Sequence, residues 1–166
     1  MVLALTDPAP IERLIVVDIA PVAYGSGHGN AAIIEALMAL PVDRIKSRSA
    51  IDAALAPAIP DPMLRSYLLA NLRRDGDKFD WRINLEGLKR SLPALLGFPK
   101  LDDRSYGGAT LAIEGGRSNY VRVQDRAVMR SLFPKVRFET VPDAGHWVHA
   151  DAPEAVGRLV ADFMAG

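Results

Sequence analysis

The sequence contains no cysteine, which excludes a disulfide framework, a cysteine-based zinc site and a cysteine nucleophile. Its three histidines, His28, His146 and His149, lack the H-E-x-x-H pattern of a helical zinc site. The formal net charge is zero, so no excess of basic residues favours binding to nucleic acid or to an acidic membrane. We therefore expect no metal, no cofactor and no nucleic-acid partner.

Long apolar runs are also missing. No stretch reaches the roughly 18 uninterrupted apolar residues of a membrane-spanning helix, so no membrane span is expected. The N-terminus has no basic region followed by an apolar core and a cleavage site, which makes a cytoplasmic location the expectation. The 166 residues, 49% of them apolar and 24% charged, are typical of a soluble globular protein with its own core.

Three strand-like runs, at residues 14–18, 109–114 and 136–141, predict the strands of a parallel sheet. The first joins leucine and β-branched residues without alternation, and the second is of the same parallel type, as in strands that are covered on both faces. Helical patterns follow the second and third runs, at 121–133 and 153–164. Right-handed crossovers would then place the three strands parallel in one sheet, so the predicted fold class is α/β.

A long, mostly helical segment separates the first strand from the second. Its four predicted helices are Ala31–Leu40 capped by Asn30, a helix that ends near Pro57 with Ser49 and Asp52 as a capping box, Met63–Arg74 opened by Asp61-Pro62, and Leu85–Leu96 with Pro93 inside. A turn is expected at residues 75–77 and a short extended piece at 79–83. No strand is expected between the helices. Such an insertion is a candidate lid over an active site, and the alternative is a simple helical subdomain.

The loop from Tyr24 to Gly29 joins the first strand to this insertion. It holds three glycines, like a phosphate-binding loop, but no G-K-[ST] ending follows them. We interpret it as a flexible connection.

Two residues with catalytic chemistry follow predicted strands. Asp18 ends the first strand, and His146 follows a glycine turn after the third. The carboxyl ends of parallel strands meet at one edge of a sheet, where open α/β sheets bind their ligands. A carboxylate beside a histidine orients a general base, which normally activates a serine hydroxyl. Taken singly, Asp18 could instead cap a turn and His146 could be an ordinary loop histidine.

Four segments resemble the α/β-hydrolase superfamily, and within it the small esterase branch of bacterial YbfF-type and mitochondrial ABHD11-like enzymes. They are L-I-V-V-D-I-A-P-V-A-Y at 14–24, W-R-I-N-L at 81–85, G-G-R-S-N-Y-V at 115–121 and G-H-W-V-H-A-D-A-P at 145–153. The match covers nearly the whole chain in the right order. It implies a serine hydrolase that cleaves a carboxylic ester or thioester with a Ser–Asp–His triad.

The resemblance also assigns roles within the triad. It implies that His146 is the base and that Asp18 is the acid. Many other members of the superfamily carry the acid after the next strand, but here that turn offers Ser118 and Asn119 instead of a carboxylate. This difference favours Asp18.

The same resemblance divides the chain into a core and a cap. Residues 1–27 and 99–166 would form the C-terminal part of the hydrolase core, with three parallel strands and flanking helices, and residues 28–98 a helical cap over an acyl pocket. The residues expected to contact the substrate are Tyr24, Ser118 and Trp147.

One motif of the superfamily is missing. The nucleophile sits in a G-x-S-x-G elbow that precedes the acid, and this sequence contains no such motif; its nearest approach, at 116–120, lacks the last glycine. We therefore expect the sequence to be the C-terminal portion of a longer hydrolase, without the nucleophile and the oxyanion hole. The chain alone is expected to be inactive, since losing even one oxyanion donor costs about 10²–10³ in rate. A weaker idea makes Ser118 a rearranged nucleophile.

The alternative function is non-catalytic. Without the preceding part of the sheet, strand 14–18 would expose an unpaired apolar edge, and such edges pair with other chains. The chain would then be a truncated hydrolase that acts as an interaction module, with a homodimer or a partner chain along this edge.

Overall fold

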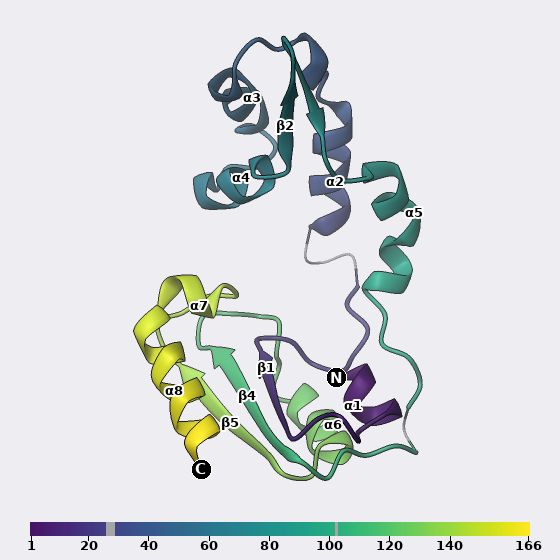
Figure 1. Ribbon diagram of the computed structural model, residues 1–166, viewed down its shortest axis with the longest axis vertical. Coiled ribbons are helices and arrows are strands. Elements are labelled where there is room, and N and C mark those ends of the chain that lie inside the picture. Colours follow the sequence, from purple (N-terminus) through teal and green to yellow (C-terminus); the bar gives the residue numbers. More distant parts are fainter. Residues whose placement is uncertain (26–28, 102) are drawn as a thin grey trace. The chain divides into compact units, whose positions relative to one another are not determined.

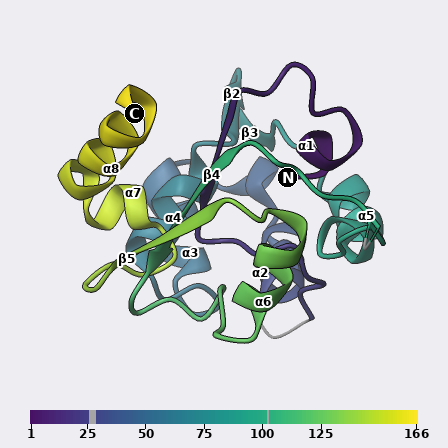
Figure 2. The same ribbon diagram turned by 90° about the horizontal axis from the view of Figure 1, so that it is seen from below.

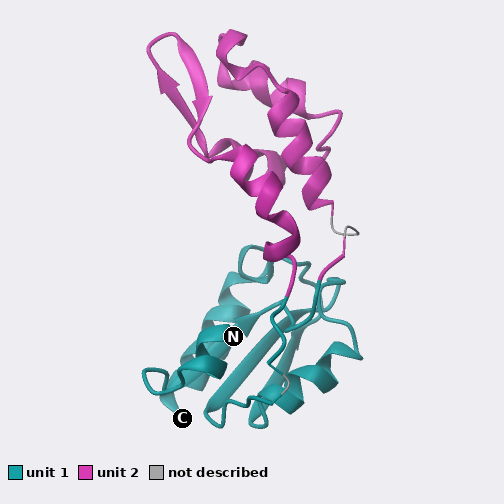
Figure 3. Cartoon of the chain, turned by 90° about the vertical axis from the view of Figure 1, so that its right-hand side faces the viewer, with its two compact units in different colours: residues 1–23, 98–166 teal, residues 24–97 magenta. Residues whose placement is uncertain are grey.

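The computed structural model describes residues 1–25, 29–101 and 103–166. The chain forms two compact units, coloured separately in Figure 3. Unit 1 consists of Met1–Ala23 and Phe98–Gly166, and unit 2 of Tyr24–Gly97. Part of the loop that we interpreted as a flexible connection, residues 26–28, lies outside the described residues.

Unit 1 is built on a three-stranded parallel sheet (Figure 1). Its strands are β1 (Arg13–Val17), β4 (Ala109–Gly115) and β5 (Val136–Val141), in the order β1-β4-β5. The three predicted strands and their parallel pairing are thereby confirmed. Strand β4 lies in the centre and all but its first residue is buried, which explains its uninterrupted apolar run.

Helices cover both faces of this sheet. Ala112 of β4 packs in one core with α1 and α6, whereas its neighbours Leu111 and Ile113 pack in another with α7 and α8. This alternation is the period-2 geometry of a strand. Figure 2 shows α8 and α6 on opposite sides of the sheet. The helices are α1 (Val2–Thr6), α6 (Asp125–Leu132), α7 (Val148–Asp151) and α8 (Pro153–Ala165).

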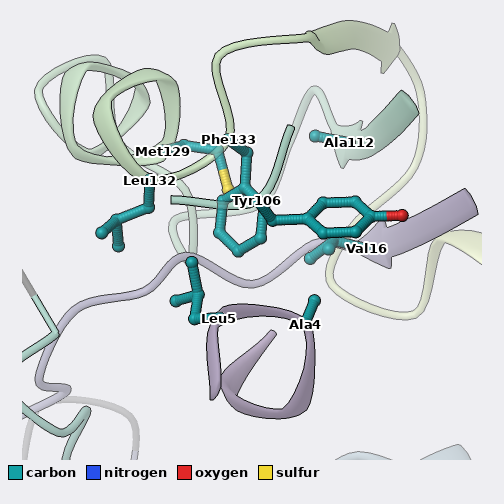
Figure 4. Packing of buried hydrophobic residues seen from close by; sticks show 8 residues of the cluster. All are labelled: Ala4, Leu5, Val16, Tyr106, Ala112, Met129, Leu132 and Phe133. Atoms are coloured by element: carbon teal, nitrogen blue, oxygen red, sulfur yellow. The ribbon is translucent and has the colours of Figure 1, made fainter. Parts of the chain in front are cut away.

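The core on the α1 and α6 face centres on two aromatic rings (Figure 4). The rings of Tyr106 and Phe133 meet edge to face with their centroids 6.3 Å apart, and both residues are buried. The Tyr106 hydroxyl donates to the carbonyl of Ile11 at 3.0 Å, so this buried polar group has a partner. The contact ties the segment before β1 to the segment before β4.

Helix α6 begins later than the sequence pattern predicts. It starts at Asp125 instead of residue 121, because a turn precedes it in which the Asp125 carboxylate accepts from the backbone N–H of Arg122 at 2.9 Å and from its guanidinium at 3.0 Å. Burial, which by itself raises the pKa of Asp125, is outweighed by these hydrogen bonds and by the charge of Arg122. The pKa of Asp125 therefore lies below its ordinary value.

Asp125→Asn is expected to lower the free energy of unfolding near neutral pH by about 1 kcal/mol, a small figure because the partner Arg122 is largely exposed. Since the folded-state pKa is depressed, the contribution is complete above the unfolded pKa of about 3.9 and is lost as the pH falls through the folded value. Urea unfolding of both proteins across the acid range measures this. A stability difference that grows towards low pH would contradict it.

Unit 2 contains five helices and one β-hairpin within the described residues. Its own core gathers around Leu37, Ile51, Leu55 and Leu69. The elements are α2 (Asn30–Ala39), the 3₁₀ helix η2 (Val42–Arg44), α3 (Arg48–Leu55), α4 (Pro62–Leu69), β2 (Leu72–Asp75), β3 (Lys78–Trp81) and α5 (Leu85–Leu95).

Two predicted helix caps are wrong. Ser47, not Ser49, caps α3, since its hydroxyl accepts from the backbone N–H of Ala50 at 3.2 Å. Asn30 is the first residue of α2 and not its cap. The cap by Asp61 is confirmed, because its carboxylate accepts from the N–H of Met63 at 2.8 Å.

The turn expected at residues 75–77 and the extended piece expected at 79–83 correspond to the Gly76 turn and to β3, but the expectation that no strand lies between the helices is wrong. The helix predicted for residues 63–74 ends at Leu69, and β2 pairs with β3 around a turn at Gly76, whose φ of 58° suits glycine. Arg73 and Asp80 face each other in the hairpin register and form an ion pair at 2.6 Å. These contacts join segments across the turn, so residues 72–74 become part of a strand in spite of their helical pattern.

Candidate active site

Asp18 leaves the sheet directly after β1 in an unusual backbone conformation. Its φ is 48°, in the left-handed region, which aspartate tolerates better than most residues. The backbone N–H still donates to the carbonyl of Ile113 on β4 at 2.8 Å, which anchors the residue at the end of the strand. Non-glycine residues in this conformation cluster at functional sites.

The Asp18 carboxylate is 1% exposed and accepts three hydrogen bonds. The backbone N–H of Gly115 donates to Oδ1 at 3.0 Å, and the His146 Nδ1 lies 2.8 Å from Oδ2. The Ser118 hydroxyl also donates to Oδ2. These donors come from the last residue of β4, from the turn that follows it and from the loop after β5. They replace the water that a buried carboxylate has lost.

The turn after β4 and the loop after β5 are bonded to each other. The backbone N–H of Gly116 donates to the carbonyl of Val141, the last residue of β5, at 2.8 Å, and the N–H of Arg117 donates to the carbonyl of Ala144 at 2.9 Å. In the same loop, the N–H of Gly145 donates to the Asp151 carboxylate at 2.7 Å. The loop that carries the histidine is therefore held on both sides.

His146 combines a fixed ring with access to solvent. Its side chain is 38% exposed, while Nδ1 is held by the buried Asp18. A carboxylate accepts only, so Nδ1 carries the proton of the neutral ring and Nε2 carries the lone pair. This is the tautomer that a general base needs.

Tyr120 completes the site and was missed at the level of sequence. Its ring stacks on the imidazole of His146 with the centroids 3.5 Å apart and the planes 10° from parallel. The residue lies in the segment G-G-R-S-N-Y-V, next to the predicted contact Ser118. The only available signal was an aromatic side chain in a turn at the carboxyl end of a strand.

The other predicted substrate contacts lie at different places. Trp147 follows the histidine and is partly buried at the start of α7. Tyr24 belongs to unit 2, where it lines a cavity of about 490 Å³ together with residues of α2 and α5. A contact of Tyr24, Ser118 or Trp147 with a substrate stays a prediction.

Within the described part of the chain, no group of three or more histidine, cysteine, aspartate or glutamate side chains could hold a metal ion. None of the helices within those same ranges is long and apolar enough to cross a membrane. The cytoplasmic location stays a prediction.

Comparison with known proteins agrees with this architecture. The chain is 38% identical to the mouse protein named sn-1-specific diacylglycerol lipase ABHD11, over 99% of this chain and 55% of that protein. It is 32% identical to Esterase YbfF of Escherichia coli, over 98% of this chain and 62% of that protein. Among solved structures, a marine microorganism esterase matches with a TM-score of 0.92 at 27% identity, covering 96% of this chain and 63% of that one.

The chain therefore spans about half the length of the curated relatives it matches. Residues 2–159 match the sequence model of the alpha/beta hydrolase family. The match spans the parallel sheet, the inserted unit and the Asp18–His146 pair, and the chain belongs to the alpha/beta hydrolase family.

Proposed function

We propose that this chain supplies the acid and the base of a Ser–Asp–His triad that hydrolyses a carboxylic ester or thioester. The nucleophilic serine would come from sequence outside residues 1–166. The observation that carries the proposal is the 2.8 Å contact between His146 Nδ1 and the buried Asp18 carboxylate at the carboxyl ends of β1 and β5.

In this reaction Nε2 of His146 takes the proton from the serine hydroxyl as its oxygen attacks the substrate carbonyl. The imidazolium then returns the proton to the leaving alcohol or thiol as the tetrahedral intermediate collapses to an acyl-enzyme. Water, deprotonated by the same nitrogen, attacks the acyl-enzyme, and the imidazolium returns that proton to the serine oxygen as the carboxylic acid is released. Throughout, Asp18 holds the Nδ1 proton and stabilises the transient positive charge on His146.

Ser118 is poorly placed to be the nucleophile. Its hydroxyl donates to Asp18 and accepts from the backbone N–H of Tyr120 at 3.1 Å. It thus binds the acid, whereas a nucleophile must meet the lone pair of Nε2 on the base. No elbow motif surrounds Ser118 either. The geometry thus argues against a rearranged triad.

Unit 2 fits the role of a cap that receives the acyl part of the substrate. Its cavity is lined largely by apolar side chains, among them Ile34 of α2, Leu92 of α5 and Leu96 directly after α5. Glu35 and Lys89, which also line it, form an ion pair at 3.2 Å. An apolar cavity with a few polar groups is typical of sites for small apolar ligands. The names of the relatives, a lipase and esterases, support an ester substrate.

One observation supports the alternative of a non-catalytic interaction module. Strand β1 stands at the edge of the sheet and pairs only with β4 among the described residues. A second copy or a partner chain could add a strand there.

Two measurements separate the alternatives. The coding DNA upstream of the Met1 codon is expected to continue in frame through a G-x-S-x-G segment. A fluorophosphonate probe is expected to label the longer polypeptide on that serine, and to leave a protein of residues 1–166 unlabelled. Labelling of Ser118, or a stop codon close upstream together with a start signal at Met1, would contradict the proposal; the second result would favour the interaction module.

A further inference from the structure

The last residue of β4 and the turn that follows it touch the acid–base pair at three points. The backbone N–H of Gly115 binds one carboxylate oxygen of Asp18, and the Ser118 hydroxyl binds the other. The third contact is the ring of Tyr120, which stacks on His146 at 3.5 Å. The first two contacts hold the acid, and the third holds the base.

We propose that Tyr120 is a positioning residue that fixes the plane of the His146 imidazole and thereby the direction of Nε2. The inference rests on the proposed function, since it assigns Tyr120 to the reaction in which His146 is the base. It goes beyond the triad because Tyr120 carries none of the protons that move.

The physical need for such a residue follows from the exposure of the histidine. A single hydrogen bond at Nδ1 leaves the imidazole able to tilt and rotate about the Nδ1–Oδ2 axis, and a side chain that is 38% exposed has room to do so. A phenol ring lying 10° from parallel against one face blocks that motion. It also places an electron-rich face beside the ring that becomes an imidazolium during the reaction.

The position of Tyr120 is in turn tied to the acid. Its backbone N–H donates to Ser118 Oγ at 3.1 Å, and that hydroxyl donates to Asp18. Asp18, Ser118, Tyr120 and His146 therefore form a closed circuit of contacts, in which each residue touches the next. Because the circuit is closed, the Asp18 carboxylate that fixes the tautomer of His146 also fixes, through Ser118 and Tyr120, the plane of its ring.

Two variants separate the ring from the hydroxyl. Tyr120→Phe keeps an aromatic face, and Tyr120→Leu removes it while leaving a smaller apolar side chain. In a protein of residues 1–166, the His146 ring protons should resonate upfield through the ring current of Tyr120, with their signals assigned from a His146→Gln variant. We expect Tyr120→Phe to retain the upfield shift and Tyr120→Leu to abolish it.

Activity is measured in the longer polypeptide that carries the nucleophile. Tyr120→Leu is expected to lower kcat about tenfold with KM nearly unchanged, because it misplaces the base without removing substrate contacts. Tyr120→Phe is expected to stay near the wild-type kcat. If the leucine variant fails to fold, Tyr120→Gln provides a second non-aromatic side chain for the same comparison.

Each failure has its own signature. Ring-proton shifts that are unchanged in Tyr120→Leu would overturn the stacking, and a kcat for Tyr120→Phe as low as that of Tyr120→Leu would overturn the role of the ring. A higher KM in Tyr120→Leu with kcat unchanged would make Tyr120 a substrate contact instead. Normal stacking in a longer polypeptide that hydrolyses no ester would show that the proposed function has failed while the geometry is right.

Discussion

Asp18→Asn in the polypeptide that carries the nucleophile is expected to lower kcat for an activated ester by about 10⁴-fold. Asparagine suits the site sterically, since it has the same shape and tolerates the left-handed φ of 48°. Its amide oxygen can still accept from the N–H of Gly115. Its NH₂ group, however, must face His146 as a donor, so Nδ1 becomes the acceptor and Nε2 carries the proton. The base then has no lone pair to offer the serine.

A neighbouring carboxylate provides the control for this experiment. Asp143 lies on the same loop as the histidine, and its side chain is 91% exposed and paired with Arg117 at 2.9 Å. Asp143→Asn removes one negative charge near the site without touching the imidazole, so kcat should change by no more than about twofold. If Asp18→Asn kept activity within about tenfold of the wild type, Asp18 would not be the triad acid.

Gly115→Ala is expected to lower the free energy of unfolding by about 1–3 kcal/mol and to reduce activity as well. A Cβ at this position would lie 2.1 Å from the carbonyl oxygen of Gly145 and 2.8 Å from that of Ala144. Both obstacles are backbone atoms, so no side-chain rotation can make room. The loop that carries His146 would have to move away from the turn that holds Asp18. Urea unfolding and ester hydrolysis measure the two effects.

Gly157→Ala is the matched control, with an effect of opposite sign. Gly157 lies inside α8, and a Cβ there would meet no atom of the described residues within 4 Å outside the backbone of its own helix. Alanine favours a helix interior over glycine by about 0.5–1 kcal/mol, so this variant should be more stable than the wild type with unchanged activity. If Gly115→Ala were as stable as Gly157→Ala, the close approach of the two loops would not constrain the site.

The sheet could be predicted from the sequence because its signal is local. Strands β1 and β4 are short apolar runs, and the run of β4 is nearly continuous because both of its faces are buried. Strand β5 instead alternates apolar and polar residues over most of its length. Only half of the hairpin in unit 2 could be predicted in this way, namely its turn at residues 75–77 and an extended piece at 79–83. Residues 72–74 are helical by pattern, and what makes them a strand is their pairing with β3, including the ion pair of Arg73 with Asp80.

The candidate site could also be predicted only in part. The rule that parallel strands present their carboxyl ends at one edge predicts that Asp18 and His146 lie close together, and the structure places them in hydrogen-bond contact. Their catalytic roles stay predictions. The stacking of Tyr120 could not be foreseen, because it depends on the turn conformation set by the hydrogen bonds of Ser118. Spacing in the sequence does not encode that conformation.

The two ends of unit 2 are joined by a hydrogen bond from the N–H of Tyr24 to the carbonyl of Leu96 at 2.7 Å. The segment therefore enters and leaves through one narrow neck, while its apolar core is made of its own residues. Such an insertion can be lengthened, shortened or exchanged in evolution without changing the strands that hold Asp18 and His146. Under the proposed function, in which unit 2 is the cap, substrate preference and catalytic chemistry can then diversify separately, and a unit transplanted from a relative should be joined at this neck.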